Sequence, residues 1–283
     1  MARLKTYLDF VRVSHTVFAL PFALMGALLA AREHPVTWTA IGWIVACMIA
    51  ARSAAMGFNR LVDAKYDALN PRTAMRELPR GAMSSREATA FVVLSSAVFV
   101  WCAFQISDLC GWLSPVALAI VFWYSLAKRF TWYTQVFLGL AMAVAPVGGW
   151  LAAGGREGWP PWLLGLAIGL WVGGFDILYA CQDVEFDRRH GLKSIPARYG
   201  IARALWISRG MHVGAVAAMA SLAWVLPLGP IYLGGVAAVA GLLVYEQSLV
   251  HRDDLSQVKR AFDLNGWVGF LYLLTTAAAL YVG

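Results

Sequence analysis

The chain has 283 residues, of which 60% are hydrophobic and 14% are charged, and its formal net charge is +7. A soluble domain carries about a quarter charged residues, so the composition excludes an ordinary soluble protein and indicates a polytopic membrane protein. The positive charge gives little support to nucleic-acid binding, because the basic residues are spread over several separate segments.

Nine apolar runs have about the length that crosses a bilayer core. Met1–Arg12 is short and polar, and no small-residue cleavage site follows it, so we expect the first helix to be retained. We predict an all-α polytopic membrane protein with a single integral-membrane domain over residues 1–283. The expected spans lie at roughly 14–31, 38–58, 88–106, 110–127, 134–154, 161–182, 205–226, 229–250 and 262–282.

The basic residues predict the orientation of these spans. With the N-terminus in the cytoplasm, the cytoplasmic segments hold 19 of the 23 Lys and Arg residues, and the outer segments hold Arg32 and Arg156. Basic residues accumulate on the cytoplasmic side of membrane proteins. We therefore expect a bacterial-type inner-membrane protein with a cytoplasmic N-terminus, cytoplasmic active-site loops and an outer C-terminus.

An acidic motif follows the second apolar run. Asn59, Asp63 and Asp67 are four residues apart, in the stretch NRLVDAKYDALNPRT. Four-residue spacing places side chains on one face of a helix, where two carboxylates repel each other unless a cation lies between them. The spacing therefore predicts a cation at the cytoplasmic end of this helix.

A second acidic motif ends the sixth apolar run. Asp183 and Asp187 repeat the four-residue step 120 residues after Asp63 and Asp67, and Asp176 and Tyr179 precede them. The repeat predicts two four-helix halves plus a ninth helix around a central chamber, with the site where the halves meet.

Two facing acidic clusters suit Mg²⁺ bound to a diphosphate. Mg²⁺ typically uses one or two carboxylates together with phosphate oxygens, and basic side chains neutralise the remaining phosphate charge. The apolar helices would receive a hydrocarbon tail, so a diphosphate on a long lipid chain fits the pattern. The nearby basic residues are Arg72, Arg76, Arg80, Lys128, Arg129, Arg188 and Lys193.

At these residues the sequence resembles the UbiA superfamily of intramembrane aromatic prenyltransferases, over essentially the whole chain. The hallmarks are NxxxDxxxD, DxxxD, a Tyr-x-x-x-Lys-Arg at Tyr124, Lys128 and Arg129, and an Asp-x-x-Tyr-Ala at Asp176. Two positions depart from the commoner pattern. The commoner first motif begins Asn-Asp, but here Arg60 follows Asn59, and Glu77 takes the place of the first Pro in the commoner Arg-Pro-Leu-Pro stretch.

The resemblance implies a Mg²⁺-dependent enzyme that transfers a polyprenyl group from polyprenyl diphosphate to an aromatic ring. An allylic cation forms in a chamber that excludes water, and the ring attacks it ortho to its hydroxyl. The implied metal ligands are Asn59, Asp63, Asp67, Asp183 and Asp187. The implied diphosphate contacts are Arg72, Tyr124 and Lys128, to which we add Arg129 and Lys193. Asp176 and Tyr179 are expected to orient the acceptor or transfer its proton.

The acceptor stays open at this point. The subgroup resembled serves ubiquinone or menaquinone biosynthesis, so the acceptor is 4-hydroxybenzoate or a dihydroxynaphthoate. Arg12, Arg52 and Arg129 are candidates for binding its carboxylate. Arg52 lies seven residues before Asn59, about 10 Å deeper in the membrane. The alternatives are another acceptor, such as homogentisate or a tetrapyrrole, and a secondary transporter, which would place its charges nearer the middle of the membrane.

Several other patterns indicate packing. The four cysteines form no CxxC pair, and the five histidines lack metal-ligand spacing. Gly165, Gly169 and Gly173 recur every four residues, which is typical of closely packed membrane helices, and Gly148–Gly149 is interpreted in the same way.

Overall fold

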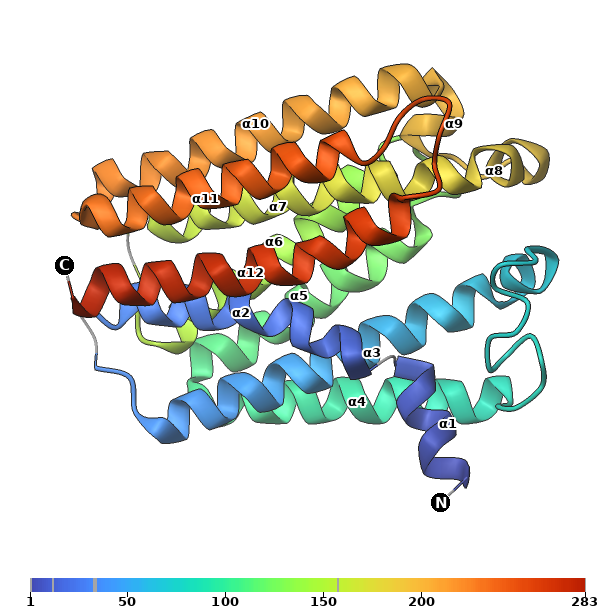
Figure 1. The fold of residues 1–283 in the computed structure, drawn as a ribbon. Helices are drawn as coiled ribbons and strands as arrows, with labels where there is room; N and C mark the ends of the chain where they lie inside the picture. The colour runs from blue at the N-terminus through green and yellow to red at the C-terminus, as the bar shows by residue number, and fades with distance from the viewer. Residues whose placement is uncertain (1, 12, 33–34, 157, 283) are drawn as a thin grey trace. The chain divides into compact units, whose positions relative to one another are not determined.

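The computed structural model describes residues 2–11, 13–32, 35–156 and 158–282, with side chains except those of residues 2–5 and 13–19. The described chain is helical almost throughout (Figure 1). The elements are α1 (Ala2–Val11), α2 (Val13–Ala30), α3 (Trp38–Leu69), α4 (Ser85–Ile106), α5 (Asp108–Ala127), α6 (Thr134–Ala152), α7 (Pro160–Ala180), η1 (Cys181–Asp183), α8 (Val184–His190), α9 (Ile195–Tyr199), α10 (Ile201–Val225), α11 (Gly229–Ser248) and α12 (Val258–Tyr281).

The nine expected spans correspond to α2–α7 and α10–α12 within the described residues, which confirms the predicted fold class. Seven of these helices are long and apolar enough to cross a membrane by length and composition. The remaining two of the nine are α2 and α10. In α2 the apolar stretch is the shorter Leu20–Ala30. The helix α10 carries Arg203 and Arg209, which lower its hydropathy.

The helices form two compact units, one of Met1–Leu20 and Trp38–Leu126, the other of Pro21–Thr37 and Ala127–Gly283. This division follows the predicted halves, except that the second part of α2 and the ninth span, α12, both belong to the second unit. The boundary in α2 falls at Pro21, whose ring removes a backbone hydrogen bond from the helix.

In the first unit α3 packs along α4. Trp43 and Trp101 meet edge to face between them, with ring centroids 5.3 Å apart. Phe58 of α3 stacks on Phe122 of α5 at 4.5 Å. Such aromatic pairs stabilise a packed interface beyond the area that they bury, so α3 is held from two sides along its membrane part.

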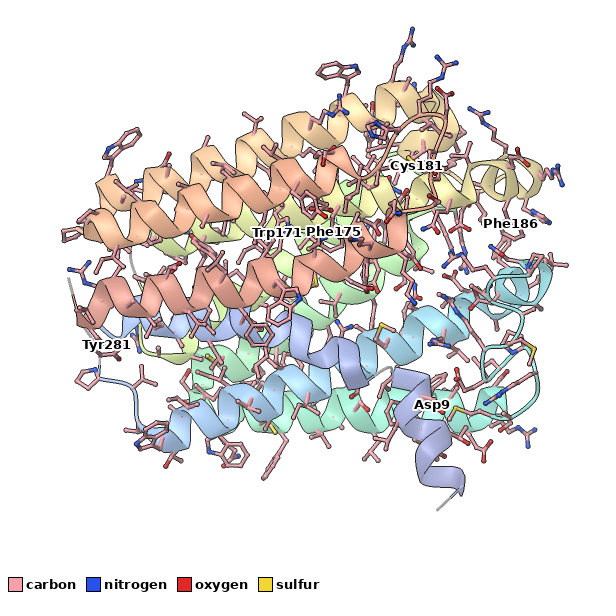
Figure 2. The ribbon with its side chains drawn as sticks, in the orientation of Figure 1. Asp9, Trp171, Phe175, Cys181, Phe186 and Tyr281 are labelled. Carbon is pink, nitrogen blue, oxygen red and sulfur yellow. The ribbon has the colours of Figure 1, made fainter. Side chains whose placement is uncertain are left out.

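In the second unit α7 is central, because it packs against α6, α10 and α12. Trp171 of α7 is fully buried, and its ring meets that of Phe22 edge to face at 5.3 Å. Figure 2 shows Trp171 and Phe175 on this helix, Cys181 where η1 follows it, and Phe186 beyond, in α8. The helix therefore runs from a buried aromatic core to the segment that carries the second acidic motif.

Glycines bring helix backbones close together in this unit. A Cβ at Gly139 of α6 would meet the carbonyl oxygen of Gly169 on α7, and one at Gly149 would meet that of Ala23 on α2. A Cβ at Gly148 would point into open space. The packing prediction is therefore confirmed for Gly149 and Gly169 but is wrong for Gly148, which faces away from its neighbours.

Local signals set the helix ends near the acidic motifs. The Ser84 side chain accepts from the backbone N–H of Glu87 at 3.2 Å, while the Glu87 carboxylate accepts from that of Ser84 at 2.8 Å. This capping box starts α4. Gly191, with φ of 67°, ends α8 in the left-handed conformation that glycine adopts without strain.

Candidate active site

The first acidic motif lies on an uninterrupted helix. The sequence predicted that the membrane run ends near residue 58, but α3 continues to Leu69, about three turns further. Asn59 donates a hydrogen bond from its side chain to the Asp63 carboxylate at 3.4 Å, and Asp63 and Asp67 are both buried. The predicted convergence of these side chains on one face is confirmed.

A basic side chain reaches Asp67 from the loop after α3. Nη1 of Arg76 lies 2.8 Å from both carboxylate oxygens of Asp67. The Thr73 hydroxyl donates to the Asp67 carbonyl at 3.0 Å, so the loop folds back over the end of its own helix. Arg72, the predicted diphosphate contact, is exposed in the turn that follows α3. The chain reversal at Asn70-Pro71 is the signal that could have favoured Arg76.

The two departures from the common motif contact each other. Nη1 of Arg60 lies 2.7 Å from Oε2 of Glu77, and both residues are buried. No sequence pattern links the two residues, which are 17 positions apart. Their opposite charges were the only feature of the sequence that could have suggested the ion pair.

The second acidic motif is built differently from the first. Asp183 closes the 3₁₀ turn η1, and Asp187 lies in the short helix α8. The Asp187 carboxylate accepts from the Ser194 hydroxyl at 2.8 Å, and Ser194 also caps α9 by accepting from the N–H of Ala197. Both aspartates are half-buried, which leaves them partly accessible.

Asp176 and Tyr179 lie one to two turns before this motif on α7. Asp183 and Asp187 lie near enough to Asp176 to act on it electrostatically. Tyr179 tilts against the ring of Phe262 on α12, with centroids 5.2 Å apart. The structure thus places these two predicted residues with the second acidic motif, between it and the aromatic core.

The basic residues near this motif differ in their contacts. The backbone N–H of Lys193 donates to the carbonyl of Lys128 at 2.8 Å, so the segments carrying the two lysines are joined. The Lys193 ammonium donates to the carbonyl of Phe130 at 3.1 Å, which ties the loop together. Arg188 donates to the carbonyl of Ala197, a structural contact. Arg129 is exposed.

The candidate acceptor-binding arginines are only partly described. Arg12 lies outside the described residues. Arg52 is half-buried on α3, and its buried Nε has no hydrogen-bond partner among the residues that the structure describes. Tyr124 of α5, a predicted diphosphate contact, lies within electrostatic range of Arg52. A buried donor without a partner costs free energy, so Arg52 is suited to an anionic ligand.

The donor set suits Mg²⁺. Within the described residues, no group of three His, Cys, Asp or Glu side chains is placed to hold a metal ion. Mg²⁺ does not need such a group, because it commonly takes one or two carboxylates and completes its shell with water and phosphate. The Asp67 carboxylate already pairs with a cation, the guanidinium of Arg76. The oxygen donors of Asn59, Asp63 and Asp67 therefore fit a hard divalent cation.

Known proteins are similar to this chain in sequence and in fold. A 4-hydroxybenzoate octaprenyltransferase of Tolumonas auensis is 33% identical over 223 residues, covering 78% of this chain and 77% of the relative. The apo structure of a UbiA homologue from Aeropyrum pernix K1 matches with a TM-score of 0.85 at 37% identity, over 95% of this chain and 98% of that one. A UbiA homologue from Archaeoglobus fulgidus, bound to GPP and Mg²⁺, matches with a TM-score of 0.74 at 21% identity, over 97% and 99% of the two chains.

The candidate spans and the sequence similarity together define an integral membrane enzyme of the prenyl-transfer class. The UbiA prenyltransferase family matches residues 19–274, and the chain belongs to this family.

Proposed function

We propose that this protein transfers a polyprenyl group from polyprenyl diphosphate to an aromatic acid, either 4-hydroxybenzoate or a dihydroxynaphthoate, with Mg²⁺ as cofactor. The observation that carries the proposal is the first acidic motif, where Asp67 holds a guanidinium beside the Asn59–Asp63 pair. Relatives named for the same chemistry, and a family member bound to GPP and Mg²⁺, support it.

The chain's own residues divide the work by chemistry. Asn59, Asp63, Asp67, Asp183 and Asp187 would hold Mg²⁺, which when bound neutralises charge on the departing diphosphate. Cationic and phenolic side chains would bind the phosphate oxygens. We assign this role to Arg72, Arg76, Tyr124, Lys128, Arg129 and Lys193.

The reaction exchanges one bond for another. The allylic C–O bond breaks and its electron pair leaves with the diphosphate, while a ring carbon ortho to the acceptor hydroxyl bonds to the prenyl carbon. The ring then loses the proton from that carbon. Asp176 and Tyr179 are proposed to orient the acceptor or to accept this proton. They lie in the last turns of α7, between its apolar part and the second acidic motif.

The acceptor carboxylate needs a cation away from the metal. Arg52 is the residue we favour, because its Nε is buried and no described side chain or backbone group accepts a hydrogen bond from it. Arg12 and Arg129 remain proposals from the sequence.

We further propose one membrane domain over residues 1–283, with the N-terminus and both acidic motifs on the cytoplasmic side.

The test is a reaction with purified protein, Mg²⁺ and geranyl diphosphate, with 4-hydroxybenzoate and 1,4-dihydroxy-6-naphthoate offered in parallel. We expect one acceptor to give a product heavier by one geranyl group. Asp63→Asn should lower the rate at least a hundredfold, because it removes a charge from the proposed Mg²⁺ site, and chelation of Mg²⁺ should stop the reaction. Absence of product from both acceptors, with geranyl diphosphate still bound, would show that the acceptor class is wrong.

A further inference from the structure

The buried ion pair between Arg60 and Glu77 joins α3 to the loop that follows it. Its side chains are 4% and 9% exposed, whereas the Arg76 side chain of the neighbouring pair is 24% exposed. Burying two charges costs about as much as their attraction returns, so two apolar residues would serve stability equally well. The pair therefore calls for an explanation other than stability.

The two ion pairs of this loop have opposite polarity. Arg76 and Glu77 are consecutive, and their partners on α3, Asp67 and Arg60, are seven residues apart, which is two turns along one face. In one pair the helix supplies the anion, and in the other it supplies the cation. A slip of the loop by one residue would bring Arg76 to Arg60 in one direction and Glu77 to Asp67 in the other, so the arrangement disfavours both shifted registers.

The Glu77 end of the loop is also anchored by packing. Leu78 and Met83 pack with the fully buried Phe10 of α1. The backbone N–H of Met83 donates to the carbonyl of Glu77 at 3.2 Å. These contacts leave Arg76 as the more exposed of the two charged residues that the loop presents to α3.

We infer that the Arg60–Glu77 pair is a positioning device, which fixes the register of the 70–83 loop and thereby holds Arg76 beside Asp67. Arg76 can then move from Asp67 to a phosphate oxygen when Mg²⁺ and diphosphate arrive, while the loop stays in place. This inference rests on the proposed function, because it gives the positioned residue a role in diphosphate binding.

The experiment uses the full-length protein in detergent and two readouts. The first is the rate at which trypsin cleaves after Arg72 and Arg80 without ligand. The second is the geranyl diphosphate concentration that gives half of the maximal thermal stabilisation at fixed Mg²⁺. The variants are Arg60→Met with Glu77→Leu, which removes both charges together, Arg76→Met, and the three changes combined. The exposed Arg86→Met is the matched control.

We expect the paired replacement to speed cleavage and to raise the half-saturating geranyl diphosphate concentration about tenfold. That factor corresponds to the lower end of the range of free energies lost with a hydrogen bond to a charged group. Arg76→Met should raise it similarly, and the combined variant no further, because both changes act through Arg76. Arg86→Met should change neither readout. If the paired replacement folds poorly, Glu77→Gln, which keeps the shape, serves in its place.

Unchanged cleavage in the paired replacement, or additive effects in the combined variant, would overturn the inference. A failure of the proposed function looks different. In that case the unaltered protein shows no Mg²⁺-dependent stabilisation by geranyl diphosphate, while the cleavage readout still reports whether the pair fixes the loop.

Discussion

Single residues carry charge into the apolar part of this protein, and Arg52 is the clearest example. It lies on α3 two turns before Asn59, on the membrane side of the acidic motif. An arginine within a membrane span is rarely tolerated without a role. Within the described part of the chain its buried Nε has no hydrogen-bond partner, so the guanidinium has a donor to offer an anion.

Arg52→Met should therefore act on the acceptor and spare the diphosphate. We expect the KM for the aromatic acid to rise 10- to 100-fold, since a hydrogen bond to a charged group is lost, while the KM for geranyl diphosphate stays within twofold. Steady-state kinetics with each substrate varied in turn measures both values.

Arg209→Met provides the control for this prediction. Arg209 is the other arginine within a predicted span, and its guanidinium lies 4.8 Å from the ring centroid of Trp206, a packing contact. The control should leave both KM values unchanged. An Arg52→Met protein with normal kinetics but a lower melting temperature would mean that Arg52, too, serves only packing.

At the scale of the helices, neighbouring glycines on α6 have different surroundings. A Cβ at Gly149 would meet the backbone of Ala23, which cannot move aside as a side chain could, whereas one at Gly148 would meet nothing. We expect Gly149→Ala to destabilise the protein by about 1–3 kcal/mol through overpacking. Gly148→Ala should be neutral or slightly stabilising, because alanine favours the helix.

Thermal unfolding of the two variants in the same detergent checks this prediction. Both substitutions add one methyl group to the same helix at adjacent positions, so differences in expression or helix propensity cancel. Equal melting temperatures would mean that α2 and α6 approach less closely than the structure has them.

The sequence predicted the helices well because membrane spans follow from a single strong signal, about 20 apolar residues in a row. It also predicted the Asn59–Asp63–Asp67 face, because four-residue spacing defines one side of a helix. It did not predict the 3₁₀ turn at Asp183. That turn lies where polar residues follow a span and hydropathy no longer distinguishes helix from loop.

The partners of the acidic residues could not be predicted for a related reason. Arg76 reaches Asp67 across a loop, and Ser194 reaches Asp187 from the start of the next helix. Such contacts depend on how irregular segments fold back, and no periodicity records that. Arg60 and Glu77 are separated by 17 positions, and their pairing appears only once the loop is in place.

At the scale of the whole molecule, charge asymmetry predicts how the protein lies in the membrane. Cytoplasmic segments hold 19 of 23 basic residues in the orientation that we propose. Cysteine labelling can test this in a simple background, because Cys47, Cys102 and Cys181 are buried and Cys110→Ser removes the remaining, partly exposed thiol.

In this background Arg156→Cys marks the α6–α7 loop and Asp253→Cys marks the α11–α12 loop, both at exposed positions. We expect a membrane-impermeant maleimide to label Arg156→Cys in intact cells and to label Asp253→Cys only after the membrane is opened. The reason is that positively charged loops are retained on the cytoplasmic side. The parent Cys110→Ser protein should stay unlabelled in both conditions. The reverse pattern would place both acidic motifs on the outer face, away from a cytoplasmic supply of prenyl diphosphate, and would contradict the proposed orientation.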